Sequence, residues 1–343
     1  GTRTQTWTCS KLRRRTQKGS CFTLKTGLVT FYHIHHYGAL LQAYATERAV
    51  ESLGSECEII DYYVNQSNDL FRAPSGVGAA AADVHTALHY GPLKTRYDRF
   101  EEFGGKYLAK TGRRYAGLEE LRAAALPCDV ILSGSDQIWN PKIFPDGHFD
   151  PVFFGAFSDR RKIAYAPSFG IPHIPESMED ELRGYLSGFS HLSVRERQGQ
   201  RIVREITGAE APVVLDPTLL LNREQWGAIA AEPVRPGGYI LCYCISSPGA
   251  LSPYIRKLQE ATGLPVVQLC GIRRKVHPRA ECVLDAGPAE FLGLFRSAAY
   301  VCTNSFHGTV FSIQFQKPFF TSVAPAEMAA PESSRTFSLL QTL

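Results

Sequence analysis

Short apolar runs alternate with helical patterns along this sequence, and that alternation restricts the fold more than any other feature. Residues 27–31 and 57–61 are strand-length apolar runs. Between them, Leu41 and Ala45 recur on one helical face, and Gly54 ends the pattern. A strand, a helix and a second strand require a parallel sheet, because parallel strands need a crossover connection. The sequence therefore predicts an α/β fold with parallel strands.

The same alternation continues to the C-terminus and divides the chain into two parts. Further strands are predicted at 130–133, 162–166, 191–195, 213–216, 239–245, 265–269, 282–284, 300–303 and 318–322. Helices are predicted at 197–206, 251–262, 288–297 and 309–316, and residues 66–126 are predicted to add helices to the first part. The 343 residues suffice for two domains. We expect two doubly wound, Rossmann-like α/β domains at 27–187 and 188–343, with the last helix returning to the N-terminal domain.

Positive charge is concentrated at the N-terminus. Residues 1–26 hold seven of the 37 lysines and arginines and none of the 33 acidic residues, so the rest of the chain is weakly acidic although the formal net charge is +4. This distribution argues against a nucleic-acid partner, which requires a basic surface on the folded body. Residues 1–26 also lack hydrophobic periodicity, and they are predicted to be a disordered or artefactual basic extension.

The cysteines indicate a reducing environment and no metal site. The nine of them form no C-x-x-C pair and no cysteine–histidine spacing typical of zinc. Several lie within apolar runs, as reduced core cysteines do in cytoplasmic proteins. No apolar stretch approaches the about 20 residues that span a bilayer. We therefore expect a cytoplasmic protein without a transmembrane segment, whose only membrane association would be peripheral.

The segment 303–308 follows a predicted strand and opens a predicted helix. The free N–H groups at a helix start attract anions, so His307 is a titratable group next to an anion-binding position. From placement alone, His307 is equally compatible with a buried structural histidine that is hydrogen-bonded to a carbonyl.

Two further charged residues lie where predicted strands end. The guanidinium of Arg195 could bind a carboxylate or phosphate with two hydrogen bonds, or it could form a structural pair with Glu196 or Asp216. Asp136 could cap the turn after its strand or bind a hydroxyl group.

Three histidines, His33, His35 and His36, crowd the loop after the first strand. No cysteine or carboxylate accompanies them in a ligand pattern, so we interpret the loop as solvated or anion-facing rather than as a metal site. The chain also lacks a Walker A loop, a G-x-G-x-x-G fingerprint after the first strand and a G-x-S-x-G elbow. The usual signals of NTP hydrolysis, dinucleotide binding and α/β-hydrolase chemistry are therefore missing.

Six motifs in register resemble those of the polysaccharide pyruvyl transferase family. They are YGALLQAYA at 37–45, GSDQIWN at 134–140, YAPSFG at 165–170, SVRE at 193–196, LDPT at 215–218 and TNSFHG at 303–308. The resemblance implies a fold similar to the two-domain GT-B glycosyltransferases. It also implies phosphoenolpyruvate as donor, a glycan or lipid-linked oligosaccharide as acceptor, no cofactor, and a role in exopolysaccharide, capsule or cell-wall glycan synthesis.

The resemblance also assigns roles to residues. The family's histidine falls on His307 and its arginine on Arg195, which makes these two the predicted catalytic residues. Other members carry an arginine two residues before the histidine, where this chain has Ser305, so Lys317 or Arg335 is expected to supply a cation for the donor. Substrate binding is predicted for Tyr37, Gly38, Gly134, Ser135, Asp136, Ser168, Asn304, Ser305, Gly308, Lys317 and Arg335.

The reaction that the resemblance implies begins at the donor. Arg195 and the helix start at 304–309 would bind its carboxylate and phosphate, and His307 would protonate its methylene carbon. Two sugar hydroxyls would then attack, with loss of phosphate, to give a cyclic ketal. Two alternatives stay open: a nucleotide-sugar glycosyltransferase on the same fold, and a catalytically inactive glycan-binding relative. The sequence does not specify the acceptor sugar, the stereochemistry of the ketal or the oligomeric state.

Overall fold

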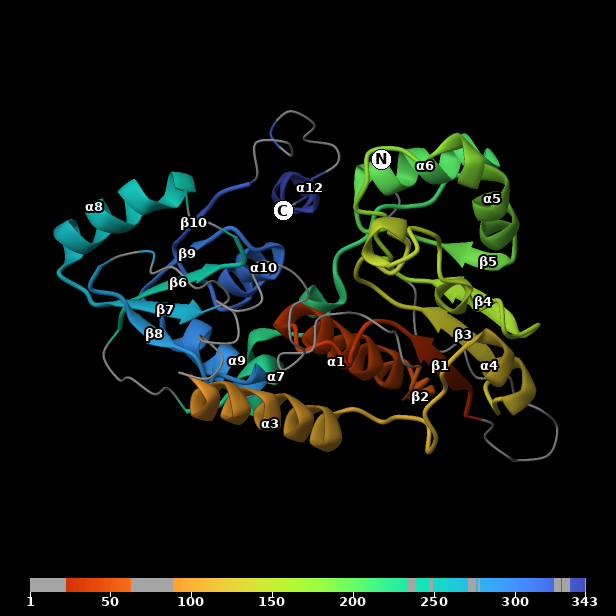
Figure 1. Cartoon of the computed structure of the whole chain (residues 1–343), viewed down its shortest axis with the longest axis horizontal. Coiled ribbons are helices and arrows are strands. Elements are labelled where there is room, and N and C mark those ends of the chain that lie inside the picture. The colour runs from red at the N-terminus through yellow and green to blue at the C-terminus, as the bar shows by residue number, and fades with distance from the viewer. Residues whose placement is uncertain are drawn as a thin grey trace, which may run out of the picture.

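The computed structural model describes residues 23–62, 89–232, 238–246, 249–270, 276, 278–323, 328 and 334–342. Residues 1–22 of the predicted basic extension lie outside these residues, and so do residues 66–88 of the region predicted to add helices. Two parallel sheets with their helices form two lobes that lie side by side (Figure 1). The prediction of two α/β domains is confirmed.

The first domain holds a parallel sheet of five strands in the order β2-β1-β3-β4-β5. The strands are β1 (Lys25–Val29), β2 (Glu56–Ile59), β3 (Val130–Ser133), β4 (Arg161–Ala164) and β5 (Phe189–Leu192). The helices are α1 (Tyr37–Ser52), α3 (Tyr90–Tyr107), α4 (Leu118–Ala124), η2 (Pro141–Ile143), η3 (Pro151–Phe154), η4 (Glu176–Met178), α5 (Glu179–Ser187) and α6 (Arg197–Thr207). Because β1 begins at Lys25, the predicted extension is too long by two residues.

The second domain holds another parallel sheet of five strands, in the order β10-β9-β6-β7-β8. The strands are β6 (Ile240–Cys244), β7 (Val266–Cys270), β8 (Glu281–Val283), β9 (Tyr300–Thr303) and β10 (Phe319–Thr321). The helices are η5 (Pro217–Leu219), α7 (Arg223–Ile229), η6 (Gly249–Leu251), α8 (Ser252–Thr262), α9 (Pro288–Ser297), α10 (Phe306–Gln314) and α12 (Arg335–Thr342). The predicted strand at 213–216 does not form, since Val213 makes only an isolated bridge with Val194.

The predicted boundary between 187 and 188 is wrong. β5 follows that point in the chain but pairs with β4 of the first sheet, where His191 lies beside Ile163 and Leu192 beside Ala164. α6 then packs on α5, so the first domain extends through Thr207. The physical reason is that the helical segment between β4 and β5 is an ordinary crossover, which returns the chain to the next strand of the same sheet.

Local signals set both ends of α1. His36 precedes this helix, and its Nδ1 accepts a hydrogen bond from the N–H of Ala39 at 3.2 Å, which caps the helix. At the other end Gly54 has a φ of 85°, a left-handed conformation that glycine adopts without strain. Its N–H donates to the carbonyl of Glu51 at 2.9 Å, so the helix ends where the sequence predicted.

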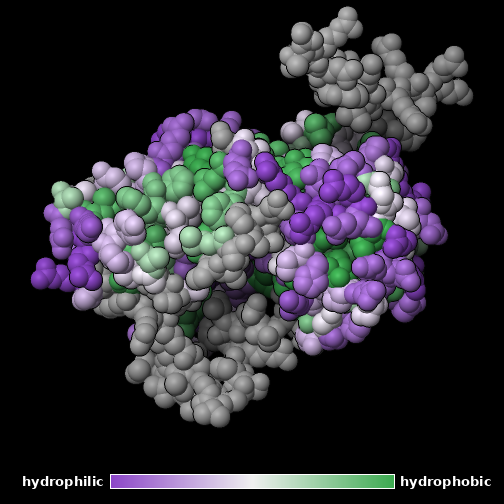
Figure 2. Space-filling model, turned by 90° about the horizontal axis from the view of Figure 1, so that it is seen from above, coloured by the Kyte–Doolittle hydropathy of each residue, from purple (hydrophilic) through white to green (hydrophobic). Residues whose placement is uncertain are grey.

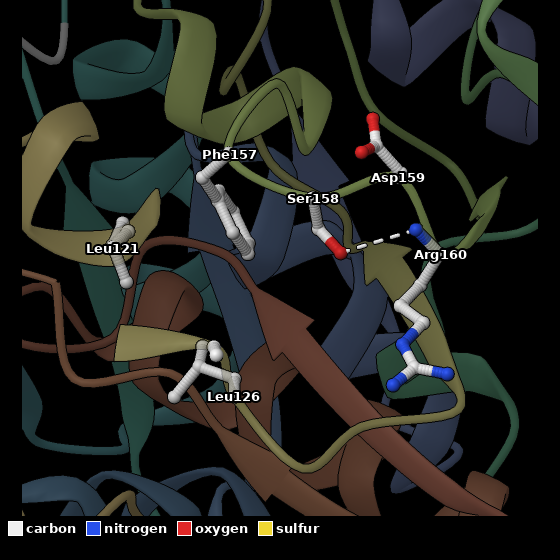
Figure 3. Close-up of a pocket in the computed structure, with 7 residues that line it drawn as sticks. Leu121, Leu126, Phe157, Ser158, Asp159 and Arg160 are labelled. Carbon is white, nitrogen blue, oxygen red and sulfur yellow. Dashed lines mark hydrogen bonds between the residues drawn. The ribbon is translucent and has the colours of Figure 1, made fainter. Parts of the chain in front are cut away.

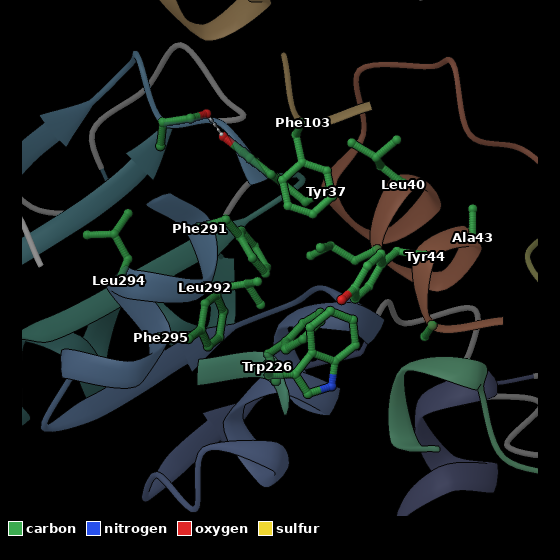
Figure 4. Close-up of a cluster of buried hydrophobic side chains, with 14 of the residues drawn as sticks. Tyr37, Leu40, Ala43, Tyr44, Phe103, Trp226, Phe291, Leu292, Leu294 and Phe295 are labelled. Atoms are coloured by element: carbon green, nitrogen blue, oxygen red, sulfur yellow. Dashed lines mark hydrogen bonds between the residues drawn. The ribbon is translucent and has the colours of Figure 1, made fainter. Parts of the chain in front are cut away.

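One hydrophobic core is shared by both domains (Figure 4). Tyr37 of α1 stacks on Phe291 of α9 with ring centroids 4.5 Å apart, and Tyr44 of α1 contacts Trp226 of α7 at 5.8 Å. α1 and α3 both pack against α9. Because a hydrophobic interface resists separation, we expect the two domains to hold one relative position.

The surface differs between the two domains. The second domain presents more hydrophobic surface than the first when the molecule is seen from above (Figure 2). The second domain also exposes Tyr254 of α8 and Phe320 of the edge strand β10, whose rings stack with centroids 5.8 Å apart. Among the described residues no helix has the length and apolar character needed to cross a membrane.

The strand order reverses once in each sheet. The reversal lies between β1 and β3 in the first sheet and between β6 and β9 in the second. Ligands of open α/β sheets bind at such points, in the crevice beyond the carboxyl ends of the strands. The loops that follow these four strands begin at residues 30, 134, 245 and 304. The topology therefore predicts a binding site at these loops.

The helix α12 connects the two domains near this place. Its Leu339 packs with Phe306 and Val310 of α10. The same helix borders a cavity together with Tyr165 and Arg195 of the first domain. The C-terminal part of the chain thus returns to the first domain.

Candidate active site

Asp216 lies at the centre of a buried charged cluster. Its Oδ2 accepts a hydrogen bond from Nη1 of Arg195 at 2.7 Å and lies 3.7 Å from Nε2 of His307. Its Oδ1 accepts hydrogen bonds from the N–H of Thr218 at 3.0 Å and from the hydroxyl of Thr218 at 2.6 Å. The two residues predicted to be catalytic therefore meet at one carboxylate, although they belong to different domains.

The first domain positions Arg195 through its sheet. The backbone N–H of Arg195, just beyond β5, donates to the carbonyl of Pro167 beyond β4 at 3.2 Å. Nη2 of Arg195 lies 3.5 Å from Oδ1 of Asp136, in the loop after β3. In the same loop, Ser135 donates its hydroxyl hydrogen to the carbonyl of Ala166 at 2.9 Å. Three neighbouring strands thus deliver these side chains to one edge of the sheet.

The second domain positions His307 through α10. Ser305 caps this helix, because its hydroxyl accepts a hydrogen bond from the N–H of Gly308 at 3.3 Å. His307 lies in the first turn and is 3 % exposed. Its ring packs on Gly38 of α1, where a Cβ would collide with the ring. Gly308 is equally confined, since a Cβ there would collide with Thr303.

The electrostatics of the cluster favour the ionised carboxylates. Burial by itself raises the pKa of Asp216, but His307 and Arg195 outweigh it and hold the pKa far below its ordinary value. The pKa of Asp136 is lowered in the same way, since Arg195, His307 and other cationic neighbours outweigh burial. Burial lowers the pKa of Arg195, but Asp216 and Asp136 outweigh this effect and raise it. The site is therefore charged at neutral pH.

Several buried polar atoms of the cluster have no hydrogen-bond partner among the described residues. They are Nε and Nη2 of Arg195, Nε2 of His307 and the hydroxyl of Ser168. Buried polar groups in proteins are nearly always paired, and an unpaired one indicates a ligand or a bound water. The arrangement can therefore bind a small molecule rich in oxygen atoms, and His307 can exchange a proton with it.

Two cavities adjoin the cluster and share Phe306 and Arg335. The first, of about 280 Å³, is bordered by Arg195, Asp216 and α12. The second, of about 210 Å³, is bordered by His307, Asp136 and His36. The guanidinium carbons of Arg195 and Arg335 lie 4.9 and 5.5 Å from the centre of the Phe306 ring. Phe306 and Arg335 thus stand between the two cavities.

A cavity of about 450 Å³ lies elsewhere, among residues that precede β3 and β4 (Figure 3). It is bordered by Leu121, Leu126 and the segment from Phe157 to Arg160, in which the N–H of Arg160 donates to the hydroxyl of Ser158 at 3.2 Å. This is the amino-terminal edge of the first sheet, opposite to the switch point. Size alone therefore does not select the site.

Most of the predicted site residues lie around the charged cluster or in the loops and helix ends that carry it. Besides Arg195 and His307, these are Gly38, Gly134, Ser135, Asp136, Ser168, Ser305, Gly308 and Arg335. Several of them shape the site through backbone or packing rather than through a free side chain. Gly134, for example, packs against Thr30, and the N–H of Ser168 donates to the carbonyl of Asp136 at 2.8 Å.

Three other predicted residues lie outside the charged cluster, and they are Tyr37, Asn304 and Lys317. The hydroxyl of Tyr37 donates to the carbonyl of Ala286 at 2.6 Å inside the shared core, because the side chain points toward α9. Asn304 connects two loops, since its Oδ1 accepts the N–H of Ile245 at 2.9 Å. Lys317 lies beyond the far end of α10, a helix of nine residues, which separates it from the helix start by about 13 Å. Lys317 therefore lies at the opposite end of α10 from His307.

The structure adds two residues, Asp216 and His36, to the candidate site. Asp216 was expected only as a possible structural partner of Arg195, and His36 only as part of a solvated or anion-facing loop. The aspartate in the LDPT motif and the position of His36 directly before a helix are the signals that could have indicated them.

Within the described residues, no group of three His, Cys, Asp or Glu side chains is arranged to hold a metal ion. His35 is engaged with Glu101 at 2.8 Å.

Comparison with known proteins gives one family and several distant structures. Residues 36–324 match the family described as polysaccharide pyruvyl transferase. A candidate UDP-N-acetylglucosamine 2-epimerase of Listeria monocytogenes is 10 % identical with a TM-score of 0.49, over 94 % of this chain and 87 % of that one. The UDP-GlcNAc 2-epimerase of Methanocaldococcus jannaschii (13 % identity, TM-score 0.45, 94 % and 92 % coverage) and the E. coli heptosyltransferase WaaC (11 %, 0.42, 93 % and 98 %) are similarly distant. No curated protein matches the sequence.

Proposed function

This chain belongs to the polysaccharide pyruvyl transferase family, and we propose that it transfers the pyruvyl group of phosphoenolpyruvate to hydroxyl groups of a glycan, closing a cyclic ketal. One observation carries the proposal. Buried nitrogen atoms of Arg195 and His307 lie near Asp216, between the two domains, and have no hydrogen-bond partner among the described residues. Donors of this kind suit a small molecule that carries a carboxylate and a phosphate. The proposed reaction needs no cofactor.

Arg195 and Arg335 are the proposed ligands of the donor's negative groups. Arg195 has two nitrogen atoms without a hydrogen bond among the described residues, and Arg335 lies over Phe306, next to His307 in the chain. Ser305 is occupied as the helix cap, so Arg335 takes the part that an arginine at position 305 would have. The positive end of the α10 dipole adds to the attraction of an anion.

In the proposed reaction His307 donates a proton from Nε2 to the methylene carbon of phosphoenolpyruvate, and the electron pair of the C=C bond forms the new C–H bond. The adjacent carbon becomes oxocarbenium-like, and a sugar hydroxyl attacks it while its proton passes to Nε2 of His307, which the first transfer left without a proton. A second hydroxyl then displaces phosphate from the same carbon, and its proton passes to the departing phosphate, which completes the ketal and releases inorganic phosphate. Ionised Asp216 stabilises positive charge on His307 before the transfer. A positioned acid increases the reaction rate by about 10²–10⁴-fold.

The proposal also includes the cellular setting. We place the reaction in the cytoplasm, on a glycan or lipid-linked oligosaccharide used for an exopolysaccharide, a capsule or the cell wall. The free cysteines among the described residues support a reducing compartment, and they are Cys57, Cys128, Cys242, Cys244, Cys282 and Cys302.

Incubation of the purified protein with phosphoenolpyruvate and a panel of methyl glycosides that carry 1,2- or 1,3-diols tests the proposal. We expect release of inorganic phosphate together with a pyruvyl ketal detected by mass spectrometry. Calorimetric titration should give binding of phosphoenolpyruvate and none of UDP-sugars. Turnover of a nucleotide sugar without binding of phosphoenolpyruvate would instead identify a glycosyltransferase. Binding of glycosides with no binding of either donor would identify an inactive relative.

A further inference from the structure

The cavity of about 210 Å³ is bordered by Asp136 and His36, whose polar side chains the proposed donor chemistry does not use. Asp136 lies beyond β3 and His36 beyond β1, the two strands on either side of the switch point of the first sheet. His307 borders the same cavity, and its ring centroid lies 6.0 Å from that of His36. The two side chains therefore face the place where the proposed proton transfer occurs.

Asp136 presents one carboxylate oxygen to the cavity. Its Oδ1 accepts the N–H of Gln137 at 2.9 Å, whereas its Oδ2 makes no hydrogen bond within the part of the chain that the structure describes. The residue has a φ of 73°, a left-handed conformation that aspartate tolerates better than most residues but that still costs energy. This backbone geometry holds a carboxylate with an unused acceptor beside the reaction centre.

His36 presents a hydrogen-bond donor. Because its Nδ1 accepts the N–H of Ala39 in the cap of α1, the single proton of the neutral ring must reside on Nε2. A second proton would break the cap and place a positive charge at the positive end of the helix dipole. Nε2 makes no hydrogen bond to any described residue, and His36 borders the cavity.

The groups around His36 reinforce its neutral form. Burial lowers the pKa of His36 to about 4, although the carboxylate of Asp136 opposes this shift. The positive charges of His307 on α10, Arg335 on α12 and Arg96 on α3 lower the pKa further. The ring therefore carries no charge throughout the physiological pH range.

An ionised acceptor next to a neutral donor matches a hydroxyl group, because a hydroxyl can donate to the first and accept from the second. An anionic group would instead face the charge of Asp136. We propose that Asp136 and His36 form the subsite that binds a sugar hydroxyl of the acceptor, with Oδ2 of Asp136 accepting its hydrogen and Nε2–H of His36 donating to its oxygen. The identity of the acceptor as a sugar diol rests on the proposed function, whereas the pairing of donor and acceptor rests on the cap of α1, on the unused oxygen of Asp136 and on the cavity that both side chains border.

The tautomer of His36 can be read without any ligand. In protein labelled with ¹⁵N-histidine, we expect the His36 resonances of an Nε2–H neutral ring that do not titrate between pH 5 and 8. The assignment comes from comparison with His36→Asn, which keeps a capping side chain before α1. An Nδ1–H tautomer, or titration near the ordinary histidine value of about 6.5, would overturn the proposal.

Binding experiments test the subsite itself. Asp136→Asn and His36→Asn should each weaken binding of the tightest methyl glycoside of the panel by about tenfold, the loss of one hydrogen bond. Phosphoenolpyruvate should bind Asp136→Asn no more weakly than the wild type, since the substitution removes a negative charge. His35→Asn is the matched control, because His35 is the preceding histidine but bonds to Glu101, and it should leave glycoside affinity unchanged.

A further comparison uses glycosides that lack one hydroxyl of the diol. The deoxy glycoside that has lost the bound hydroxyl should bind His36→Asn and the wild type equally well. Failure of every glycoside to bind the wild type, or loss of phosphoenolpyruvate binding with unchanged glycoside binding in both variants, would overturn the subsite. Glycoside binding that depends on Asp136 and His36 in a protein that does not bind phosphoenolpyruvate would instead preserve the subsite and refute the proposed function.

Discussion

At the scale of single residues, Asp216 determines the state of the buried charges. It is 1 % exposed, and Arg195, its hydrogen-bonded partner, is 4 % exposed. Neither charge has access to bulk water, so each depends on the other for compensation. Removal of one partner of such a pair costs about 3–5 kcal/mol, because it leaves a buried charge unpaired.

We therefore expect Asp216→Asn to lower the free energy of unfolding at pH 7 by about 3 kcal/mol or more. The lowered pKa of Asp216 means that its stabilisation is fully present above the unfolded value of about 3.9 and is lost as the pH falls below it. Urea unfolding from pH 7 to pH 3 measures the free energy of unfolding of both proteins. The difference between Asp216→Asn and the wild type should become smaller only below about pH 4. Asp180→Asn, at a fully exposed position, should show no gap. Equal stability of Asp216→Asn and the wild type at pH 7 would contradict the argument.

His307→Ala tests the proposed acid. We expect turnover to fall by about 10²–10⁴-fold, the contribution of a positioned acid, while phosphoenolpyruvate still binds through Arg195 and Arg335. Phosphate release measures turnover, and circular dichroism together with thermal unfolding verifies the fold. Near-normal turnover in the folded variant would refute the role of His307.

At the scale of elements, α1 serves both the fold and the site. Its side chains contribute to the shared core, and its second residue, Gly38, leaves room for the His307 ring. An alanine at this position would favour the helix by up to about 1 kcal/mol, but its methyl group would displace the ring. Stability and activity are therefore expected to change in different directions or by different amounts.

The matched pair Gly38→Ala and Gly91→Ala separates these effects. Gly91 is the second residue of α3, and a Cβ there meets nothing within 4 Å. We expect Gly38→Ala to lower kcat at least tenfold and Gly91→Ala to leave kcat unchanged while raising the melting temperature slightly. The kinetics of phosphate release provide the measurement. Equal activity of the two variants would show that the contact between Gly38 and His307 has no functional weight.

A second prediction for α1 concerns Glu47, whose carboxylate accepts the N–H of Ala109 at 3.2 Å. Burial raises the pKa of Glu47 to about 7, although Ala109 and Arg48 oppose it. The folded state therefore binds the proton more tightly than the unfolded chain, where the pKa is about 4.3, and stability falls as the pH rises between these values. Glu47→Gln keeps an acceptor for Ala109 and removes this titration. Urea unfolding at pH 5 and pH 8 should give a smaller loss of stability for the variant, and parallel losses would contradict the assignment.

Individual elements could largely be predicted from the sequence, because strand-length apolar runs and helical periodicity are local signals. The segments 130–133, 288–297 and 300–303 were predicted with the bounds they have. The direction of a side chain is not local. Tyr37 was placed at the ligand because of its motif, but the packing of α1 against α9 turns its ring into the shared core. Lys317 was expected to supply a cation beside His307, but the length of α10 places it at the opposite end of the helix.

At the scale of the whole molecule, the assignment of β5 to a sheet was beyond the sequence, since an apolar run does not state which neighbour it will join. The cluster around Asp216 has the same character. Arg195 and His307 were recognised from their motifs, but their meeting depends on two sheets facing each other at their switch points. The neutral state of His36 likewise follows first from burial of its side chain by the assembled structure and then from positive charges on three other elements. Such properties belong to the assembled molecule.

Two buried tryptophans differ in whether they belong to the shared core. Trp226 of α7 is fully buried and contacts Tyr44 of the first domain and Phe311 of the second, with ring centroids 5.8 and 5.1 Å apart. Trp139 is also fully buried, but it packs within the first domain, where it stacks on Phe154. Each indole N–H donates to a backbone carbonyl, so the two tryptophans are matched in burial and hydrogen bonding.

If the shared core couples the domains, the wild type unfolds in one transition, with calorimetry and near-ultraviolet circular dichroism in agreement. Each tryptophan-to-alanine change should cost about 3–5 kcal/mol. Trp139→Ala should lower the temperature of a single transition, because the interface is intact and the domains still unfold together. Trp226→Ala should broaden the transition or split it in two, because the lost side chain is one of the contacts between the domains. Two transitions in the wild type, or a Trp226→Ala transition as sharp as that of Trp139→Ala, would mean that Trp226 does not couple the domains.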